Sequence, residues 1–172
     1  MCLRPLEVDD VPVLVGWAAD DTFRSRAGWS RGPGPELSAF WHGQVATPAR
    51  DLLRLGVVHA GDLVGYVDLH GRDAHERELG YLIGPSDRWG AGLGTAAAEA
   101  GLAYAFDVLA FRAVWAESDD PVSLRILRRL GLTETEPRNA TDGFAFRRLR
   151  IERPAWAAWC GRDSQQPGDP LS

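Results

Sequence analysis

The sequence predicts a mixed α/β (α+β) fold: a single domain with one twisted central sheet of about six to seven strands, flanked by helices on both faces. The first observation is that strand-like runs alternate along the chain with runs of helical periodicity. The second is a hairpin signal, Ala60-Gly61-Asp62, between two strand-like runs. The third is a strand-like run, residues 76–83, which leads through a glycine-rich turn into a long helical stretch and a further strand, as in a parallel crossover.

The first part of the chain contains one strand and two helices in this prediction. Residues 3–6 form a short strand, and Asp9-Asp10 starts a helix that ends near Asp20. Residues 22–35 are rich in glycine and proline, so we expect a loop there. Residues 36–45 repeat their apolar side chains at helical spacing, which predicts the second helix.

The middle of the chain carries four of the expected strands. Residues 52–59 and 63–69 flank the hairpin turn, and residues 76–83 form the strand that pairs with the second of them. An alanine-rich helix follows from residue 95 to about residue 109, and its slim profile suits close packing on a sheet. Residues 111–117 then form a strand that we expect to run parallel to residues 76–83.

The next segment begins with a clear helix entry. Asp120-Pro121 combines a capping side chain with proline at the first helical position, and the helix ends at Gly131. Two closing strands are expected at residues 132–136 and 144–151, joined by a turn at residues 139–143.

The C-terminal residues are divided between the domain and a tail. Residues 154–160 predict a last helical turn, with Trp156 and Trp159 packing inward. We expect the domain to span residues 1–160. Residues 161–172 form a polar tail with proline and glycine, for which we expect disorder.

Charge and hydropathy exclude several classes of function. The formal net charge is −5, which argues against a nucleic-acid partner and mildly favours a cationic one. No apolar run reaches the roughly 18 residues of a membrane span, so we expect no membrane partner. The N-terminus lacks the apolar segment of a secretory signal, which predicts a cytosolic (cytoplasmic) protein.

The cysteines and histidines, which often bind metals, are not spaced here as metal ligands are. Cys2 and Cys160 lie at opposite ends of the chain, and we expect free thiols. The four histidines have no metal-ligand spacing, so we expect no metal site. All 19 basic residues are arginine, which leaves the N-terminus as the only amine of the chain.

The most informative motif is the turn between residues 76–83 and the long helix. Gly90, Gly92 and Gly94 let the backbone bend without a Cβ penalty and allow a ligand to approach the main chain closely. The helix that follows presents unpaired N–H groups and the positive end of its dipole. This order of strand, glycine turn and helix predicts a site for a diphosphate.

Three segments together resemble a known family. They are Leu3-Arg4-Pro5-Leu6 with Asp9-Asp10, the block of residues 78–100, and residues 120–132. In this order and spacing they resemble the GNAT superfamily of acyl-CoA-dependent N-acyltransferases, in particular its RimJ/RimL-like (ribosomal-protein-alanine acetyltransferase) branch. The resemblance covers about residues 3–152, so residues 1–160 are interpreted as a GNAT-like N-acetyltransferase domain.

The sequence departs from the family pattern at two positions. Trp89 occupies the first position of the pyrophosphate motif, where the family usually has glutamine or arginine; Arg88 precedes it, and Trp-Gly is a variant found in the RimL-like branch. Asp120 stands where the family commonly has asparagine. A carboxylate can accept a hydrogen bond from a pantetheine amide but cannot donate one, and helix capping is the other role open to Asp120.

The resemblance implies acetyl-CoA as cosubstrate. The implied contacts to the diphosphate are the backbone amides of residues 90–95, and the pantetheine arm pairs with residues 82–84 like an extra strand. A main-chain N–H near Leu82 then faces the thioester oxygen. The implied cofactor-binding residues are Leu82, Ile83, Gly84, Arg88, Trp89, Gly90, Ala91, Gly92, Leu93, Gly94, Thr95 and Asp120. Arginines 125, 128 and 129 are candidates for the 3′-phosphate or form a solvated helix end.

Two residues are candidates for proton transfer. Glu78 shares a strand face with Leu82 and is the candidate general base. A sheet-edge charge or an orienting residue is its other interpretation, and Glu76 is the alternative base. Leu127 occupies the position at which many GNAT enzymes have a tyrosine acid. Ser123 matches a serine of the RimL-like branch and is the candidate acid, although a serine in a first helical turn often bonds backbone.

The acceptor is the least specified part of the prediction. Trp29 and Trp41 offer flat apolar walls and His70 lies near a strand end, so these three are the candidate substrate-binding residues. Their other interpretations are core or solvated loop residues for the tryptophans and a surface turn for His70. A small-molecule amine, either a metabolite or an amine-bearing antibiotic, is the expected acceptor, attacked directly in a ternary complex. Protein N-terminal α-amines are one alternative, and an acyl-CoA-binding module without catalysis is another. The resembling proteins are often dimers, which makes a homodimer the partner arrangement to test.

Overall fold

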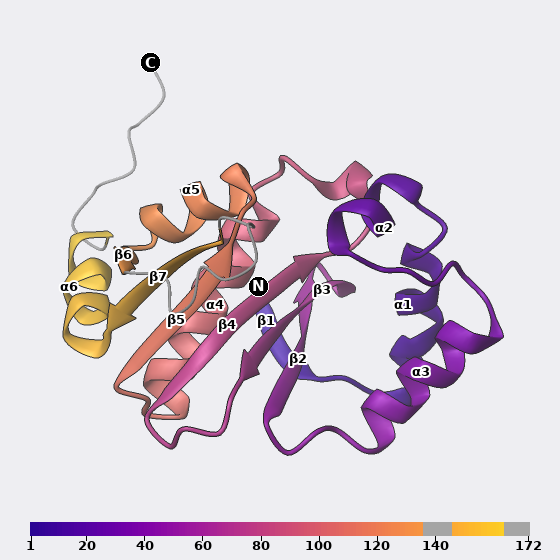
Figure 1. Cartoon of the computed structure of the whole chain (residues 1–172), viewed down its shortest axis with the longest axis horizontal. Helices are drawn as coiled ribbons and strands as arrows, with labels where there is room; N and C mark the ends of the chain where they lie inside the picture. Colours follow the sequence, from indigo (N-terminus) through magenta and orange to yellow (C-terminus); the bar gives the residue numbers. More distant parts are fainter. Residues whose placement is uncertain (136–145, 164–172) are drawn as a thin grey trace.

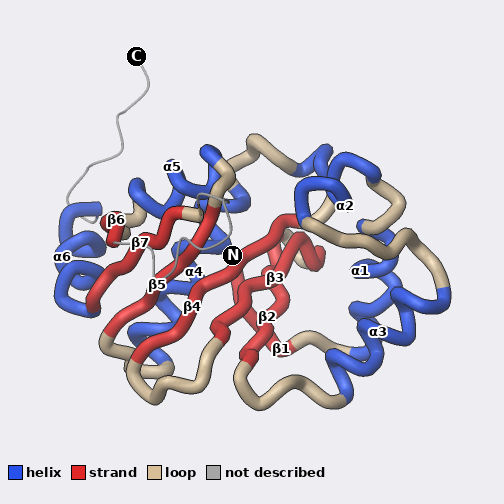
Figure 2. The backbone as a smooth tube through the Cα atoms, in the orientation of Figure 1, coloured by secondary structure: helices blue, strands red, loops and turns tan. Residues whose placement is uncertain are grey.

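The computed structural model describes residues 1–135 and 146–163, and it confirms a mixed α/β fold built on a seven-stranded sheet (Figures 1 and 2). The strands are β1 (Cys2–Pro5), β2 (Leu52–His59), β3 (Asp62–His70), β4 (Glu76–Ile83), β5 (Ala113–Ser118), β6 (Thr133–Thr135) and β7 (Arg147–Glu152). The α-helices are α1 (Val11–Trp17), α2 (Asp21–Ala27), α3 (Pro35–Ala46), α4 (Leu93–Ala103), α5 (Pro121–Arg129) and α6 (Arg153–Asp163). Short helical turns lie at η1 (Val8–Asp10), η2 (Ser86–Arg88) and η3 (Tyr104–Val108), the last of them a π-helix that continues α4.

The strand order is β1-β2-β3-β4-β5-β7-β6, and it divides the sheet into two parts. The first four strands pair antiparallel, and β7 pairs antiparallel with both β5 and β6. Among the described strands, only β4 and β5 run parallel, joined through α4 as predicted. The parallel junction is therefore the place where the two antiparallel parts meet.

Glycine shapes the β2–β3–β4 meander at two points. The hairpin turn places Ala60 at φ 52° and Gly61 at φ 92°, the positive values that tight hairpin turns require. In β3, a Cβ on Gly65 would lie 2.2 Å from the carbonyl oxygen of Leu82. Any larger residue at position 65 would therefore force β3 away from β4.

Two apolar clusters lie on opposite faces of the sheet. Tyr66 packs with α1, α2 and α3, whereas its neighbour Val67 packs with α4 and α5. Because successive side chains of a strand point to opposite faces, helices cover both faces, as predicted. Figure 1 shows α1, α2 and α3 together at one end of the molecule, α5 and α6 at the other, and α4 behind β4 and β5.

The prediction of a loop over residues 22–35 is wrong in its first part, because Asp21–Ala27 forms α2. The side chain of Asp20 accepts a hydrogen bond from the Phe23 N–H at 3.0 Å and caps the helix. Phe23 is fully buried, and Gly28 ends the helix at φ 67°. The glycine- and proline-rich composition begins only at Gly28, so averaging over the whole segment concealed the helix.

The remaining elements agree with the prediction apart from their ends. Helix α4 begins at Leu93, two residues earlier than expected. In α6, Trp156 is buried and stacks on Trp159 with ring centroids 5.1 Å apart, so the inward packing is confirmed. The helix itself continues to Asp163. The turn predicted at residues 139–143 and residues 164–172 of the predicted tail lie outside the described residues.

The described part of the chain has neither a helix suited to crossing a membrane nor a cluster suited to binding a metal. None of its helices is long and apolar enough to cross a membrane. Nor does any group of three or more His, Cys, Asp or Glu side chains within residues 1–135 and 146–163 have a geometry that could hold a metal ion.

Candidate functional site

A cleft of about 610 Å³ lies beside the C-terminal half of β4, bordered by the turn before α4, the first turns of α5 and one side of α2. The lining includes most of the predicted cofactor residues: Leu82, Ile83, Arg88, Trp89, Gly90, Gly92, Leu93, Gly94, Thr95, Asp120 and also Ser123. Gly84 and Ala91 adjoin these in the chain. The two 3′-phosphate candidates Arg125 and Arg129 also line the cleft. Residues that the sequence did not indicate complete the lining: Phe23, Arg26, Ala27, Tyr81, Val122 and Ile126.

The cleft exists because β4 and β5 diverge. Their pairing covers only Glu76–Glu78 of β4, so the strand beyond Glu78 has a free edge on the β5 side. The Gly84 N–H donates to Val64 of β3, and hydrogen-bonded pairs alternate in an antiparallel ladder. The Leu82 N–H consequently also faces β3. The free N–H groups on the cleft side are those of Tyr81 and Ile83, one residue to either side of the predicted position.

The turn into α4 leaves its N–H groups without partners. Gly90 and Gly92 adopt φ values of 83° and 80°, and a Cβ at either position would have no atom within 4 Å. Gly92 occupies the N-cap position and contributes no side-chain hydrogen bond. Within the described residues, no acceptor bonds the N–H groups of residues 90–95. Several donors and the positive end of the helix dipole therefore face the cleft.

Trp89 fixes this turn to the sheet. Its indole Nε1–H lies 3.0 Å from the carbonyl oxygen of Gly84 and 3.3 Å from that of Ile83. These carbonyls belong to the end of β4, so the side chain ties the glycine turn to the strand edge. The structure thus gives Trp89 a positioning contact in addition to its place in the cleft wall.

The charge of the cleft is opposite to that of the whole protein. Four arginines line it, Arg26, Arg88, Arg125 and Arg129, against one carboxylate, Asp120. Arg88 lies 3.9 Å from Asp62, whereas the other three arginines form no ion pair within the described residues. A net positive cleft in a chain of net charge −5 favours an anionic ligand.

Helix α5 carries two of the predicted residues at its start. Asp120 caps it, because its carboxylate accepts the Val122 N–H at 3.0 Å, and it also borders the cleft. The Ser123 hydroxyl lies 2.9 Å from the Tyr81 hydroxyl. Burial raises the pKa of Tyr81, and the hydrogen bond to Ser123 lowers it by less. Sequence reasoning missed Tyr81, since only the packing of α5 against β4 brings the two hydroxyls together.

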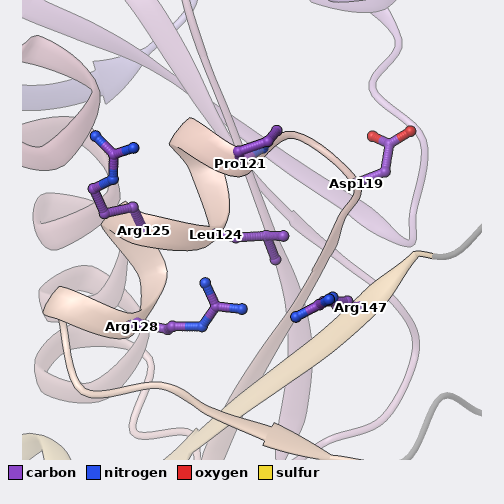
Figure 3. A pocket seen from close by; sticks show the side chains of 6 residues that line it. All are labelled: Asp119, Pro121, Leu124, Arg125, Arg128 and Arg147. Carbon is purple, nitrogen blue, oxygen red and sulfur yellow. The ribbon is translucent and has the colours of Figure 1, made fainter.

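A second cavity, of about 590 Å³, lies on the other side of α5 and is lined by Asp119, Pro121, Leu124, Arg125, Arg128 and Arg147 (Figure 3). Figure 3 shows the guanidinium groups of Arg128 and Arg147 pointing toward one another. Both bond the carboxylate of Glu134. Of the three arginines predicted near a 3′-phosphate, Arg125 and Arg129 line the cleft, whereas Arg128 faces this second cavity.

Glu78 lies on β4 outside the lining of the cleft, on the same strand face as Leu82. Gly80 between them carries no side chain, so nothing on β4 separates the carboxylate from Leu82. Burial and the negative charge of Glu117 raise the pKa of Glu78, while His70 and Arg148 lower it less. A carboxylate with a raised pKa is better suited to accept a proton near neutral pH.

Glu76, the alternative base, has a different environment. Its carboxylate oxygens lie 3.3 and 3.2 Å from Arg150 Nε and Nη2. Glu78 has no arginine within hydrogen-bond distance in the described part of the chain; its ion-pair contact is His70 Nδ1 at 3.9 Å. The arrangement favours Glu78 over Glu76 as the residue free to exchange a proton.

None of the three predicted acceptor residues lines the cleft. Trp41 is 1% exposed and lies in the core with α1 and α2, where Arg54 covers its ring at 5.1 Å. Trp29 is half-buried, and its ring centroid lies 5.5 Å from that of Trp41. His70 has a 54% exposed side chain beside Glu78. Only Trp29 and His70 therefore keep surface that a ligand can reach.

Asp20 connects α2 to the turn at the end of β4. One carboxylate oxygen caps α2, and the other accepts the Ser86 N–H at 2.7 Å and the Ser86 hydroxyl at 2.6 Å. These hydrogen bonds, led by the Ser86 hydroxyl, lower the pKa of Asp20 to about 2. The helix that forms one wall of the cleft is thereby fixed to the segment that leads into the glycine turn.

Comparison with known proteins assigns the class. The sequence signature described as acetyltransferase (GNAT) domain matches residues 1–133. The chain therefore belongs to the GNAT acetyltransferase family. No curated protein sequence is significantly similar to it.

Solved structures of GNAT enzymes share the fold. Spermidine N-acetyltransferase from Vibrio cholerae, in complex with CoA and spermine, superimposes with a TM-score of 0.73 at 18% identity, covering 91% of this chain and 97% of that one. The aminoglycoside acetyltransferase AAC(6')-Ib in complex with coenzyme A superimposes with a TM-score of 0.72 at 14% identity, covering 91% of this chain and 96% of that one. A GCN5-related N-acetyltransferase from Brucella melitensis superimposes with a TM-score of 0.71 at 22% identity, covering 91% of this chain and 77% of that one.

Proposed function

We propose that the protein is an acetyl-CoA-dependent N-acetyltransferase that acetylates a primary amine of a small molecule by direct attack in a ternary complex. The observation that carries this proposal is the cleft at the β4–β5 divergence, which combines unpaired N–H groups, unpaired arginines and a free strand edge. Spermidine and aminoglycoside acetyltransferases among the structural neighbours support a small amine as acceptor. Trp89-Gly90 and Ser123 support placing the chain in the RimJ/RimL-like branch.

The donor set of the cleft fits acetyl-CoA. This cosubstrate would supply an acyl group activated as a thioester and carried on an anionic diphosphate tail. The N–H groups of residues 90–95 would hold the diphosphate, beside the empty space at Gly90 and Gly92. Arg125 and Arg129 would hold further phosphate charge. The free N–H groups of Tyr81 and Ile83 lie too far apart along the strand to share one acceptor, so one of them would donate to the acyl oxygen as it gains negative charge.

Glu78 would carry the proton transfer that makes the acceptor nucleophilic. An amine attacks only when neutral, so its ammonium form must first lose a proton, and Glu78 would take it directly or through one water. The raised pKa of Glu78 makes this transfer less unfavourable than it would be for an ordinary glutamate. Phe23 and Ala27 of α2 provide an apolar wall of the cleft near Leu82.

The test measures thiol release from acetyl-CoA across a panel of polyamines, aminoglycosides, amino acids and N-terminal peptides. We expect turnover on a small amine, with a loss of roughly 10²- to 10⁴-fold in kcat for Glu78→Gln. Glu76→Gln is the matched control and should stay within a few-fold of the native enzyme. Acetyl-CoA binding without turnover on any amine would contradict the proposal and favour a binding module. Turnover only on N-terminal peptides would show that the acceptor is a protein N-terminal α-amine and not a small-molecule amine.

A further inference from the structure

Two hydroxyl groups meet inside the cleft. The Tyr81 hydroxyl comes from β4 and the Ser123 hydroxyl from the first turn of α5, 42 residues away, and they lie 2.9 Å apart. Both residues line the cleft. This is the one hydrogen bond between two hydroxyl side chains in the described part of the chain.

The surroundings hold the pair in place. Tyr81 is partly buried and packs against the core around α4, and a Cβ on Gly94 would touch its ring at 3.8 Å and Ile126 at 3.4 Å. Ser123 occupies a helix turn in which a serine commonly bonds its own backbone. Here it bonds the Tyr81 hydroxyl instead, and the Val122 N–H of the same turn is bonded by Asp120. The Ser123 hydroxyl is thus directed to the phenol by the fold.

We propose that Tyr81 and Ser123 form a two-hydroxyl relay that delivers a proton to the departing sulfur of the acyl donor. The inference rests on the proposed function. As the amine nitrogen bonds to the acyl carbon and the bond from that carbon to sulfur breaks, Ser123 gives its hydroxyl proton to the sulfur. Ser123 takes the phenolic proton of Tyr81, and solvent returns a proton to the phenolate. Glu78 passes the first proton of the ammonium to solvent before attack and takes the second as the amide forms, so charge and atoms balance.

The chemistry of the two hydroxyls assigns their order. A phenol has an ordinary pKa near 10 and is a far stronger acid than an aliphatic alcohol, so Tyr81 can restore the proton that Ser123 gives away. Burial keeps the phenol protonated at neutral pH, since it raises the pKa of Tyr81. Sequence reasoning assigned the acid to Ser123 alone; the geometry makes Tyr81 the residue that replenishes it.

The first test measures binding and needs no turnover. Calorimetry compares CoA with desulfo-CoA, which lacks the sulfur, for the native protein and for Tyr81→Phe, Ser123→Ala and the control Tyr104→Phe. We expect the native protein and Tyr104→Phe to prefer CoA by about 3- to 10-fold, the worth of one hydrogen bond. The preference should fall toward one in both relay variants. An unchanged preference in Tyr81→Phe would overturn the relay.

The second test measures kcat with the acceptor found for the native enzyme. Tyr81→Phe, Ser123→Ala and the double variant should each lose a similar factor, roughly 10- to 100-fold, with little change in KM for acetyl-CoA, because residues that act as a unit are not additive. A loss confined to Ser123→Ala would overturn the role of Tyr81. If the native protein neither binds CoA nor releases thiol, the proposed function fails instead. The melting temperatures of all variants show whether each one folds. If Tyr81→Phe does not fold, the preference of Ser123→Ala for CoA over desulfo-CoA decides whether the relay holds.

Discussion

Two strand-to-helix junctions lie side by side in this molecule and are built in opposite ways. At the start of α5, Asp120 caps the Val122 N–H, Pro121 occupies the first helical position, and Ser118 accepts the Asp120 N–H at 3.1 Å. At the start of α4, Gly92 is the N-cap and contributes no side chain. One junction satisfies its own donors, and the other leaves them to the cleft. The difference supports our proposal that the start of α4 is the one that binds a ligand.

The contrast has a conformational cause. Gly92 adopts φ 80°, a value that side-chain-bearing residues rarely take, whereas Asp120 sits in the extended region at φ −75° and ψ 120°, where capping side chains work. Asp120 can therefore cap α5 with its own side chain, without a ligand. The α4 junction obtains stability from packing of its alanines against β4 rather than from a cap.

The largest expected effect comes from giving the α4 junction its own carboxylate. Thr95→Asp places a negative charge in the first turn of α4, on the cleft lining. It should weaken CoA binding by roughly a hundredfold or more, because like charges a few ångströms apart repel by up to about 4 kcal/mol near a protein surface. The same charge favours the helix N-terminus, so the melting temperature should not fall. Calorimetry and thermal unfolding measure the two effects.

Thr95→Asn is the matched control for this change. It removes the same hydroxyl and has the same shape as Asp but carries no charge, so its loss of affinity should stay within about tenfold. Equal losses of affinity in the two variants would show that phosphate charge is not what this junction binds.

An intermediate effect is expected at the capped junction. Asp120→Ala removes the side chain that accepts the Val122 N–H and should cost about 1 kcal/mol, a fall of about 2–4 °C in Tm for a chain of this size. Asp120→Asn keeps an acceptor and should unfold close to the native temperature. If Asp120→Ala lost CoA affinity by more than tenfold without losing stability, the residue would serve the ligand rather than the helix.

The smallest effect is a pH dependence at Asp20, which caps α2 and holds Ser86 near the uncapped junction. Its pKa falls from an ordinary 3.8 to about 2, so the native contact stabilises the fold above about pH 4, and this contribution is lost as the pH falls through 2. The native protein should therefore have a higher urea midpoint than Asp20→Asn at neutral pH, and the gap should narrow at pH 2–3. Asp21→Asn is the control; its side chain is 85% exposed and, within the described residues, pairs only with Arg24, so its gap should be much smaller.

Local signals in the sequence predicted both junctions, because glycine spacing and an Asp-Pro pair each act within a few residues. The same signals placed β4 at Glu76–Ile83 and its parallel partner correctly. Helix α2 escaped prediction because a single cap and one buried phenylalanine define it, inside a segment whose composition suggests a loop.

Features that depend on tertiary contacts could not be read from the sequence. The choice between Glu76 and Glu78 depends on Arg150, which comes from β7, at the other end of the chain. The Tyr81–Ser123 contact depends on how α5 packs over β4. The flat apolar ring of Trp41 suits a substrate-binding surface, yet in the fold Arg54 covers this ring.

The central claim is that the uncapped start of α4 binds the diphosphate of CoA. The most direct measurement is a titration of the ¹⁵N-labelled protein with CoA, following the amide resonances of Gly90, Gly92 and Gly94 against the already bonded amide of Val122. The account predicts large shifts at the three glycine amides and a smaller one at Val122, with saturation at one equivalent. CoA binding that leaves the resonances of the three glycine amides unshifted would contradict the claim.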